Sequence, residues 1–598
     1  MRTSTTGFWS RAAAGTAALV LLMTGCSSSS TPEGAAGSEE SGGSVSVAMT
    51  TPNWILPISQ PGKTGGENAI FGDALYPSVF SWQLAGDAEF NIDTEASLAE
   101  IPEVSEDGLT YTITLKDLQW SDGEPITARD VEFWYNLVEA NKEEWASYRE
   151  GGFPDNVDSF EVVDDKTFTL TTTEAYAPGW YLGNQLNALT PMPAHAWNKT
   201  SDDGEVSDLD RDPETAAEVF DYLVSASEDP ASYDSNPLWD TVSGAWTLES
   251  YTPGGEVVLA ANENYQGADA ASLSEVVFKP FTDDNSQFNV LRSGEIDYGH
   301  IPASAIDQQS VIESNGYTVE PWHGWSITYM PMNFNNPETG HLFKQKYLRQ
   351  AMQQLIDQET ISEVVWRGAA APTCGPVPQE PGASGTMDGC AYGFDPEAAI
   401  TLLEDNGWTV NDGGVSTCDN PGTGEGQCGE GVEAGDELRF TLTSQSGFTA
   451  TSRMMAEIKS QFSRAGIELE IREVPDSVAV TQACEPGDAE CDWDLSFFGS
   501  QGSWYYPVYA SGERLFATDA PVNLGRYSDE TADELIDATQ FSSDPEALQD
   551  YNDFLAEDLP VLWMPNPVNR ISAFSSDIQG ISPQDPMLTM RPQDWSRG

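Results

Sequence analysis

The chain has 598 residues, of which 39% are hydrophobic and 10% aromatic, and 96 acidic against 26 basic residues give it a formal net charge of −70. This length predicts about two to four domains, and the composition excludes a disordered chain. The negative charge repels phosphate groups, so it excludes nucleic acid as a partner and also excludes electrostatic docking on anionic lipid.

The N-terminal residues have the pattern of a lipoprotein export signal. Basic residues precede an apolar stretch over residues 12–23, which is too short to span a membrane. The stretch ends in Leu-Met-Thr-Gly-Cys, which resembles the bacterial lipobox and implies cleavage before Cys26 and lipid attachment to it. We predict a signal peptide over 1–26, a flexible Ser/Gly-rich tether over 27–44, and a lipid-anchored protein on the outer face of the cell membrane. A signal peptide with an incidental cysteine is the alternative.

The most informative segment covers residues 109–137. Tyr111 and Ile113 alternate with threonines, as in a half-buried strand. A Trp-Ser-Asp-Gly turn follows, and Thr127 with Asp130 then predicts a capping box at the start of a helix. The predicted buried face of that helix comprises Val131, Trp134, Tyr135 and Val138.

This strand, turn and helix resemble the signature region of the extracellular solute-binding proteins of family 5, the peptide- and nickel-type receptors of ABC importers. The matching positions are Asp107, Gly108, Leu109, Thr110, Tyr111, Leu115, Trp120, Ser121, Asp122, Gly123, Pro125, Thr127, Ala128, Asp130, Val131 and Phe133. Asp117 and Leu118 depart from the pattern, because the family usually has a basic residue and a glycine there. Further collinear matches lie at residues 76–87, 96–100, 159–172, 243–248, 257–265, 276–298 and 348–357.

Other elements follow from apolar periodicity and from helix caps. Strands are predicted over residues 44–49, 159–172 (two short strands), 438–443, 467–474, 493–499 and 559–564, the last returning to the first half of the molecule. Helices are predicted over 213–224, 348–357, 396–407 and 455–466, and one opens at Asp544-Pro545. Alternation of strands and helices predicts an α/β second half with a largely parallel sheet.

The resemblance implies the α/β fold of periplasmic binding proteins, with two lobes joined by hinge strands and a ligand held between lobes that close on it. Lobe 1 is expected to comprise residues 45–317 and 556–598, with a subdomain inserted at about 78–240. Lobe 2 is expected to comprise residues 318–555.

Six cysteines besides Cys26 suit an exported protein with disulfide bonds. Their close spacing favours the pairs Cys374–Cys390, Cys418–Cys428 and Cys484–Cys491. A zinc site is the alternative, which the chain disfavours because it has no C-x-x-C motif and its four histidines are scattered.

The sequence contains no Walker loop and no G-x-S-x-G motif, so we predict a binding protein without a cofactor or metal rather than an enzyme. The resemblance implies a monomeric substrate-binding lipoprotein that captures oligopeptides or dipeptides and delivers them to a permease and ATPase complex. A receptor for a non-peptide solute such as an oligosaccharide, and a structural or adhesive surface lipoprotein, are the alternatives.

The resemblance also places three separate loops on the walls of one cleft. The expected ligand-binding residues are Asn53, Trp54, Trp322, Trp325, Tyr329, Ser500, Ser503 and Trp504. Peptide receptors of this family hold the peptide's amino group on an aspartate at the position of Ser503, and Ser500 replaces a tryptophan of the same motif. A serine cannot neutralise a buried ammonium. Either another acid serves, or the ligand binds differently, or it lacks a free amino terminus.

Overall fold

The computed structural model describes residues 42–82, 92–281, 283–379, 387, 389–475, 479, 491, 493–498, 509–520 and 522–598. Residues 41–598 form one compact unit. Within the described ranges, no helix combines the length and the apolar character that a membrane span needs. Two large hydrophobic cores organise this unit, one built mostly from residues 45–298 and the C-terminal segment, the other from residues 327–564. We call the parts around them the first and the second lobe.

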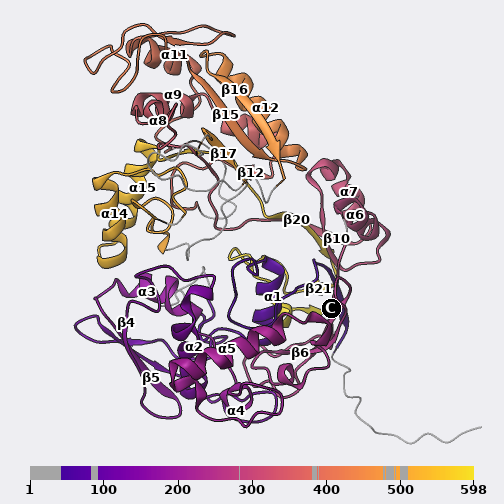
Figure 1. Ribbon diagram of the computed structural model, residues 1–598. Coiled ribbons are helices and arrows are strands. Elements are labelled where there is room, and N and C mark those ends of the chain that lie inside the picture. The colour runs from indigo at the N-terminus through magenta and orange to yellow at the C-terminus, as the bar shows by residue number, and fades with distance from the viewer. Residues whose placement is uncertain are drawn as a thin grey trace, which may run out of the picture. The chain divides into compact units, whose positions relative to one another are not determined.

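The first lobe contains a mixed seven-stranded sheet, part of which is visible at the right of this lobe in Figure 1. Its strands, in spatial order, are β10 (Tyr317–Trp322), β20 (Arg570–Ser575), β9 (Tyr298–Ile301), β1 (Ser44–Ala48), β8 (Glu275–Lys279), β7 (Val257–Ala261) and β6 (Trp246–Tyr251). The strand β1 is parallel to β8 and β9, whereas β20 is antiparallel to both of its neighbours. The chain therefore leaves the first lobe after β10 and returns to it at β20.

The segment over residues 109–137 folds as predicted. Strand β3 (Thr110–Thr114) lies in a four-stranded sheet with β2 (Glu103–Val104), β5 (Thr167–Thr172) and β4 (Val157–Val162), so the two strands predicted over 159–172 also form. Helix α2 (Ala128–Ala140) begins with the predicted capping box, in which the Thr127 N–H donates to the Asp130 carboxylate at 2.8 Å. Its predicted face is buried in the first core, where the Tyr135 ring stacks on the Phe160 ring of β4 at a centroid distance of 4.9 Å.

The remaining helices of the first lobe surround these sheets. They are α1 (Gly66–Leu75), α3 (Pro178–Asn184), α4 (Ala194–Trp197), α5 (Pro213–Ser227), α6 (Asp284–Ser293) and α7 (Gln309–Ser314). Helix α5 contains the helix predicted over 213–224, and the Asp212 side chain caps it by accepting from the Glu214 N–H at 3.0 Å.

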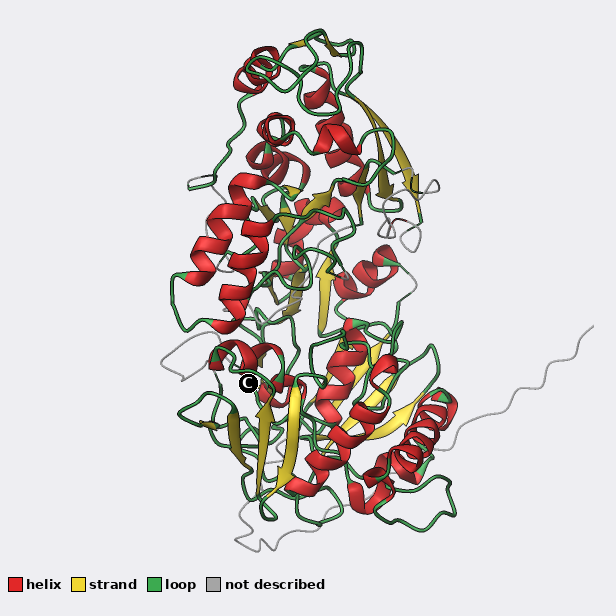
Figure 2. Ribbon diagram, turned by 60° about the vertical axis from the view of Figure 1, so that its left-hand side comes forward, coloured by secondary structure: helices red, strands yellow, loops and turns green. Residues whose placement is uncertain are grey.

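The second lobe contains the predicted parallel sheet. Strand β15 (Arg439–Gln445) pairs in parallel with β16 (Glu468–Val474) and β17 (Leu495–Phe497). The helices of this lobe are α8 (Gly340–Phe343), α9 (Lys346–Gln354), α10 (Gln358–Thr360), α11 (Pro396–Asp405), α12 (Thr449–Ser463), α14 (Glu530–Phe541) and α15 (Ala547–Asp558). Figure 2 shows the helices and strands packed together in both lobes.

One strand prediction is corrected by its pairing. Residues 559–564 do contain a strand, β18 (Val561–Trp563), but it pairs with β11 (Tyr329–Pro331) in the second lobe. The strand that returns to the first lobe is β20, because the fully apolar β18 is buried in the second core and the chain crosses only after it. Two-stranded pairs complete the fold: β12 (Ala370–Ala371) with β19 (Asn566–Pro567), β13 (Trp408–Thr409) with β14 (Thr417–Cys418), and β21 (Ile578–Gln579) with β22 (Ser596–Arg597). The predicted lobe boundaries stay a prediction.

Two of the predicted disulfides are present in the structure. Cys374 is bonded to Cys390 and Cys418 to Cys428, with Cα–Cα distances of 5.0 and 6.2 Å. Cys491 is also disulfide-bonded, while Cys484 lies outside the described residues.

Candidate functional site

The two residues predicted on the loop after β1 have different environments. Trp54 is 3% exposed and belongs to the first core, because it begins an apolar run with Ile55 and Leu56. Its indole N–H donates to the Ile58 carbonyl oxygen at 3.1 Å. Asn53 is exposed, and its side-chain oxygen accepts from the Asn68 amide at 3.1 Å. Of this pair, Asn53 is the one that a solute can reach in this structure.

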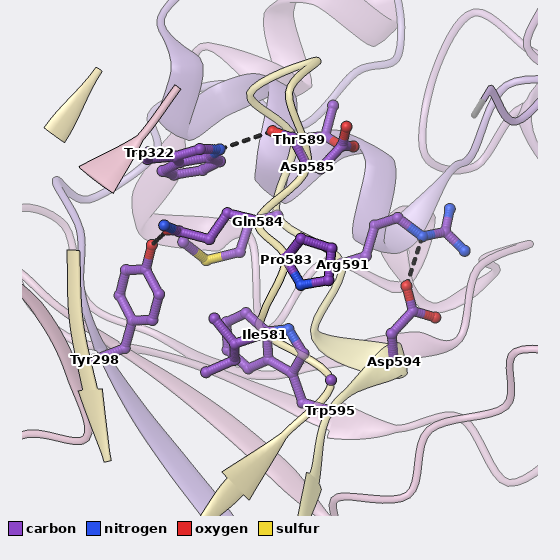
Figure 3. A pocket seen from close by; sticks show the side chains of 12 residues that line it. Tyr298, Trp322, Ile581, Pro583, Gln584, Asp585, Thr589, Arg591, Asp594 and Trp595 are labelled. Atoms are coloured by element: carbon purple, nitrogen blue, oxygen red, sulfur yellow. Dashed lines mark hydrogen bonds and ion pairs between the residues drawn. The ribbon is translucent and has the colours of Figure 1, made fainter. Parts of the chain in front are cut away.

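Trp322 and Trp325 both contact the C-terminal segment. Trp322 ends β10, and its indole N–H donates to the Asp585 carbonyl oxygen at 2.7 Å. The backbone N–H of Trp325 donates to the Pro586 carbonyl oxygen at 3.0 Å, and the Trp325 side chain is half-buried. Trp322 also lines a recess of about 80 Å³ with Tyr298 and residues 580–595 (Figure 3). The hydrogen bonds thus fix the start of the second half of the chain against its last residues.

A second recess, of about 140 Å³, lies between the end of α1 and the same C-terminal segment. Asp73 lines it, and the protein around the carboxyl raises its pKa to about 6. Burial is the main cause and Asp585 adds to it, whereas Arg591 acts in the opposite direction. The Arg591 guanidinium is held by the carboxylates of Asp269 at 2.6 Å and Asp594 at 2.9 Å. The charged side chains that line this recess are therefore predominantly acidic.

Direct contacts between the lobes gather around α3. Pro178 occupies the first turn of this helix, and Trp180 is 1% exposed. The Trp180 indole N–H donates to the Ser511 hydroxyl of the second lobe at 2.7 Å. Further contacts join Asn184 to the Tyr509 carbonyl at 3.0 Å, the Ala177 N–H to the Gln540 carbonyl at 2.8 Å, and the Tyr176 ring to the Phe541 ring at 4.9 Å. We call this contact region the α3 seam.

Next to the α3 seam, the second lobe buries polar groups that lack hydrogen bonds. Tyr329 is 3% exposed and packs edge-on against Phe516 and Trp563, at centroid distances of 5.6 and 6.4 Å. Burial raises the pKa of the Tyr329 hydroxyl well above its ordinary value, so it stays protonated. Neither this hydroxyl nor the Trp563 indole N–H has a hydrogen-bond partner among the described residues. Both are buried donors whose hydrogen-bonding capacity is unused among the described residues.

Glu513 is the acidic member of this group. Its side chain is 5% exposed, and one carboxylate oxygen accepts from the Ser511 hydroxyl while the other has no partner within the described part of the chain. Burial raises the pKa of this carboxyl, and Arg149 of the first lobe acts against that shift. Buried donors and an acceptor at the boundary between two lobes suit the binding of a polar solute.

Several predicted residues cannot be placed. Ser500, Ser503, Trp504 and Cys26 lie outside the described residues, so their roles stay predictions. Across the ranges that the structure does describe, no group of three or more His, Cys, Asp or Glu side chains is arranged to hold a metal ion.

Sequence reasoning missed three parts of this region: Glu513, Trp180 and the C-terminal residues 583–591. Trp180 carried a weak signal, since it lies in the aromatic stretch Tyr-Ala-Pro-Gly-Trp-Tyr. No pattern in the sequence distinguishes Glu513, because it is one of 96 acidic residues.

Comparison with known sequences gives matches along most of the chain. A family profile described as "Bacterial extracellular solute-binding proteins, family 5 Middle" matches residues 93–520. Protein XP55 of Streptomyces lividans is 24% identical over 534 residues, which cover 88% of this chain and 84% of that protein. The oligopeptide-binding protein AppA of Bacillus subtilis is 23% identical over 586 residues and covers 94% of each chain.

Solved structures match along the same length. The structure of AppA from Bacillus subtilis in complex with a nonapeptide has a TM-score of 0.64 at 20% identity and covers 93% of this chain and 99% of that chain. NikA from Brucella suis in complex with Fe(III)-EDTA has a TM-score of 0.69 at 18% identity, and the match covers 93% of this chain and 100% of that chain. DppA from Helicobacter pylori in complex with the peptide STSA has a TM-score of 0.61 at 17% identity, and the match covers 93% of this chain and 98% of that chain. These matches confirm the predicted fold class, and their different ligands show that this fold alone does not select the solute.

Proposed function

Because the chain belongs to family 5 of the bacterial extracellular solute-binding proteins, we propose that it captures oligopeptides between its two lobes and delivers them to an importer in the membrane. Membership of the family shows the general function: this is an extracellular substrate-binding protein of an ABC importer and not an enzyme, as predicted. The identity of the solute is the part that we propose.

The group of unpaired polar side chains beside the α3 seam carries this proposal. A peptide presents carbonyl oxygens, which fit the free Tyr329 hydroxyl and Trp563 N–H, and a positive amino terminus, which fits the Glu513 carboxylate. An oligosaccharide has no cation for that carboxylate. The full-length similarity to an oligopeptide-binding protein supports the same solute class.

The first experiment is native mass spectrometry of the purified protein, followed by titration with nonapeptides of mixed sequence. We expect a ladder of bound peptide masses and a higher melting temperature, because saturation at about 100 times Kd adds about 2.7 kcal/mol to the stability of the folded state. A single neutral oligosaccharide in the bound fraction, together with no response to the nonapeptides, would refute the proposal in favour of a sugar receptor. A bound metal chelate would refute it in favour of a metal receptor.

We further propose that Cys26 carries a lipid anchor and that the residues between Cys26 and β1 tether the binding unit beside its permease and ATPase partners. The lipobox sequence before Cys26 supports this. We expect Cys26→Ser to abolish incorporation of a labelled fatty acid, because the thiol that carries the lipid is gone. Equal labelling of the variant and the unchanged protein contradicts the anchor.

A further inference from the structure

Glu513 is a buried acid that forms no ion pair with any of the residues that the structure describes. One oxygen accepts from the Ser511 hydroxyl, which in turn accepts from the Trp180 indole N–H of the first lobe at 2.7 Å. The other oxygen is buried and has no partner among the residues that the structure places. This chain of two hydrogen bonds brings the carboxylate to the boundary between the lobes.

A buried carboxylate destabilises a protein unless a cation or several donors compensate for lost hydration. Arg149 and Arg514 lower the pKa of Glu513, but burial outweighs them and the net shift is upward. Arg149 stays beyond ion-pair distance, and none of the ion pairs between described residues includes Glu513. Among the described residues, the carboxylate therefore has no cation that offsets the free energy of its lost hydration.

One tyrosine hydroxyl lies beside the backbone that carries this carboxylate. Gly512, the residue before Glu513, lies so close to Tyr551 that a Cβ on it would be 2.5 Å from the Tyr551 hydroxyl. Burial, with the charge of Glu513 adding to it, raises the pKa of Tyr551 well above its ordinary value. Tyr329 and Tyr551 are 3% and 1% exposed, so both hydroxyls face protein rather than bulk solvent. An anion with the neutral hydroxyls of Ser511 and Tyr551 close to it matches a primary ammonium group, which has three N–H donors to distribute.

We propose that Glu513 binds the free amino terminus of the captured peptide, replacing the acid that is absent at Ser503. This assignment rests on the proposed function and adds the residue that selects an unblocked amino end. The ammonium pairs with the carboxylate oxygen that has no partner among the described residues and supplies the cation that those residues do not. The amino terminus then lies beside the α3 seam, so its capture is linked to contact between the lobes.

The test compares Glu513→Gln with the unchanged protein and with Glu534→Gln, which removes one charge from an exposed position in α14. The probes are nonapeptides of mixed sequence with a free or an acetylated amino terminus, and the readout is calorimetric affinity for the best-bound sequence. We expect the unchanged protein and Glu534→Gln to prefer the free amino end at least tenfold, and Glu513→Gln to lose that preference. Glutamine keeps an oxygen for Ser511, so the packing is retained.

A second readout separates binding from a structural role. Without peptide, Glu513→Gln should melt at a higher temperature than the unchanged protein at neutral pH, because it removes an uncompensated buried charge. A lower melting temperature makes the carboxylate structural and overturns the assignment. In the unchanged protein, affinity for the free peptide should fall as acid protonates Glu513, while affinity for the acetylated peptide should not.

The outcomes also distinguish the two proposals. Binding of both peptide forms with equal affinity by the unchanged protein, or a preference that survives Glu513→Gln, overturns the role of Glu513 and leaves peptide capture intact. Failure of the unchanged protein to bind any nonapeptide overturns peptide capture and this assignment with it.

Discussion

Arg349→Met should lower the free energy of unfolding by about 3 kcal/mol, near the lower end of the range for breaking a buried ion pair. Arg349 lies in α9 with a side chain 5% exposed, and it meets the Asp558 carboxylate at 3.0 Å. Its guanidinium also donates to the carbonyl oxygens of Asp558 at 2.7 and 3.0 Å and of Phe343 at 2.8 Å. Methionine keeps most of the volume but leaves all these oxygens without the cation. Lys346, 3.4 Å from the other Asp558 oxygen, limits the loss.

The matched control for this effect is Arg439→Met. Arg439 also pairs with two acids, Glu437 and Glu468, but all three side chains are about half exposed, at 50%, 50% and 45%. Water already solvates these charges, so we expect a change of about 1 kcal/mol or less. Urea unfolding followed by tryptophan fluorescence measures both variants. Equal losses of unfolding free energy in the two variants would show that burial does not increase the contribution of the Arg349 pair.

The fold was predictable from the sequence because its signals are local. The alternation around Tyr111, the capping pair Thr127 and Asp130, and the Pro-Gly boundaries of α11 each depend on neighbouring residues. Local rules also explain the one corrected strand. The apolar pattern of residues 561–563 identifies a buried strand, but it cannot say which of two sheets takes it.

The site was less predictable, because its members meet through long-range contacts. Trp54 and Trp322 have the same side chain and were both expected in a cleft, yet the apolar run around Trp54 draws it into the first core. Trp322 is buried in the same core, and it also meets Asp585, which is 263 residues away. No local pattern encodes that pairing, and none distinguishes Glu513 from the many solvated acids.

The largest effect that we expect on ligand affinity comes from Trp180→Phe. Phenylalanine keeps the aromatic stacking on Tyr176, whose ring lies 5.4 Å away, but it removes the N–H that reaches Ser511 across the lobe boundary. Ser511 is 1% exposed, so water does not replace the donor, and an unsatisfied buried acceptor costs about 1–3 kcal/mol. This cost falls on the arrangement in which the lobes touch. A solute held between the lobes needs that arrangement, so the apparent affinity should fall about tenfold or more.

The matched control for Trp180→Phe is Trp197→Phe. Trp197 is fully buried in the first lobe, and its indole N–H donates to the Leu238 carbonyl oxygen at 2.6 Å, so the substitution removes the same kind of hydrogen bond from within one lobe. We expect it to lower the melting temperature without changing the affinity for a nonapeptide measured by calorimetry. If Trp180→Phe also changes only the melting temperature, the α3 seam is a packing contact and takes no part in holding the solute. If affinity falls in Trp180→Phe alone, the hydrogen bond between the lobes is part of the binding equilibrium.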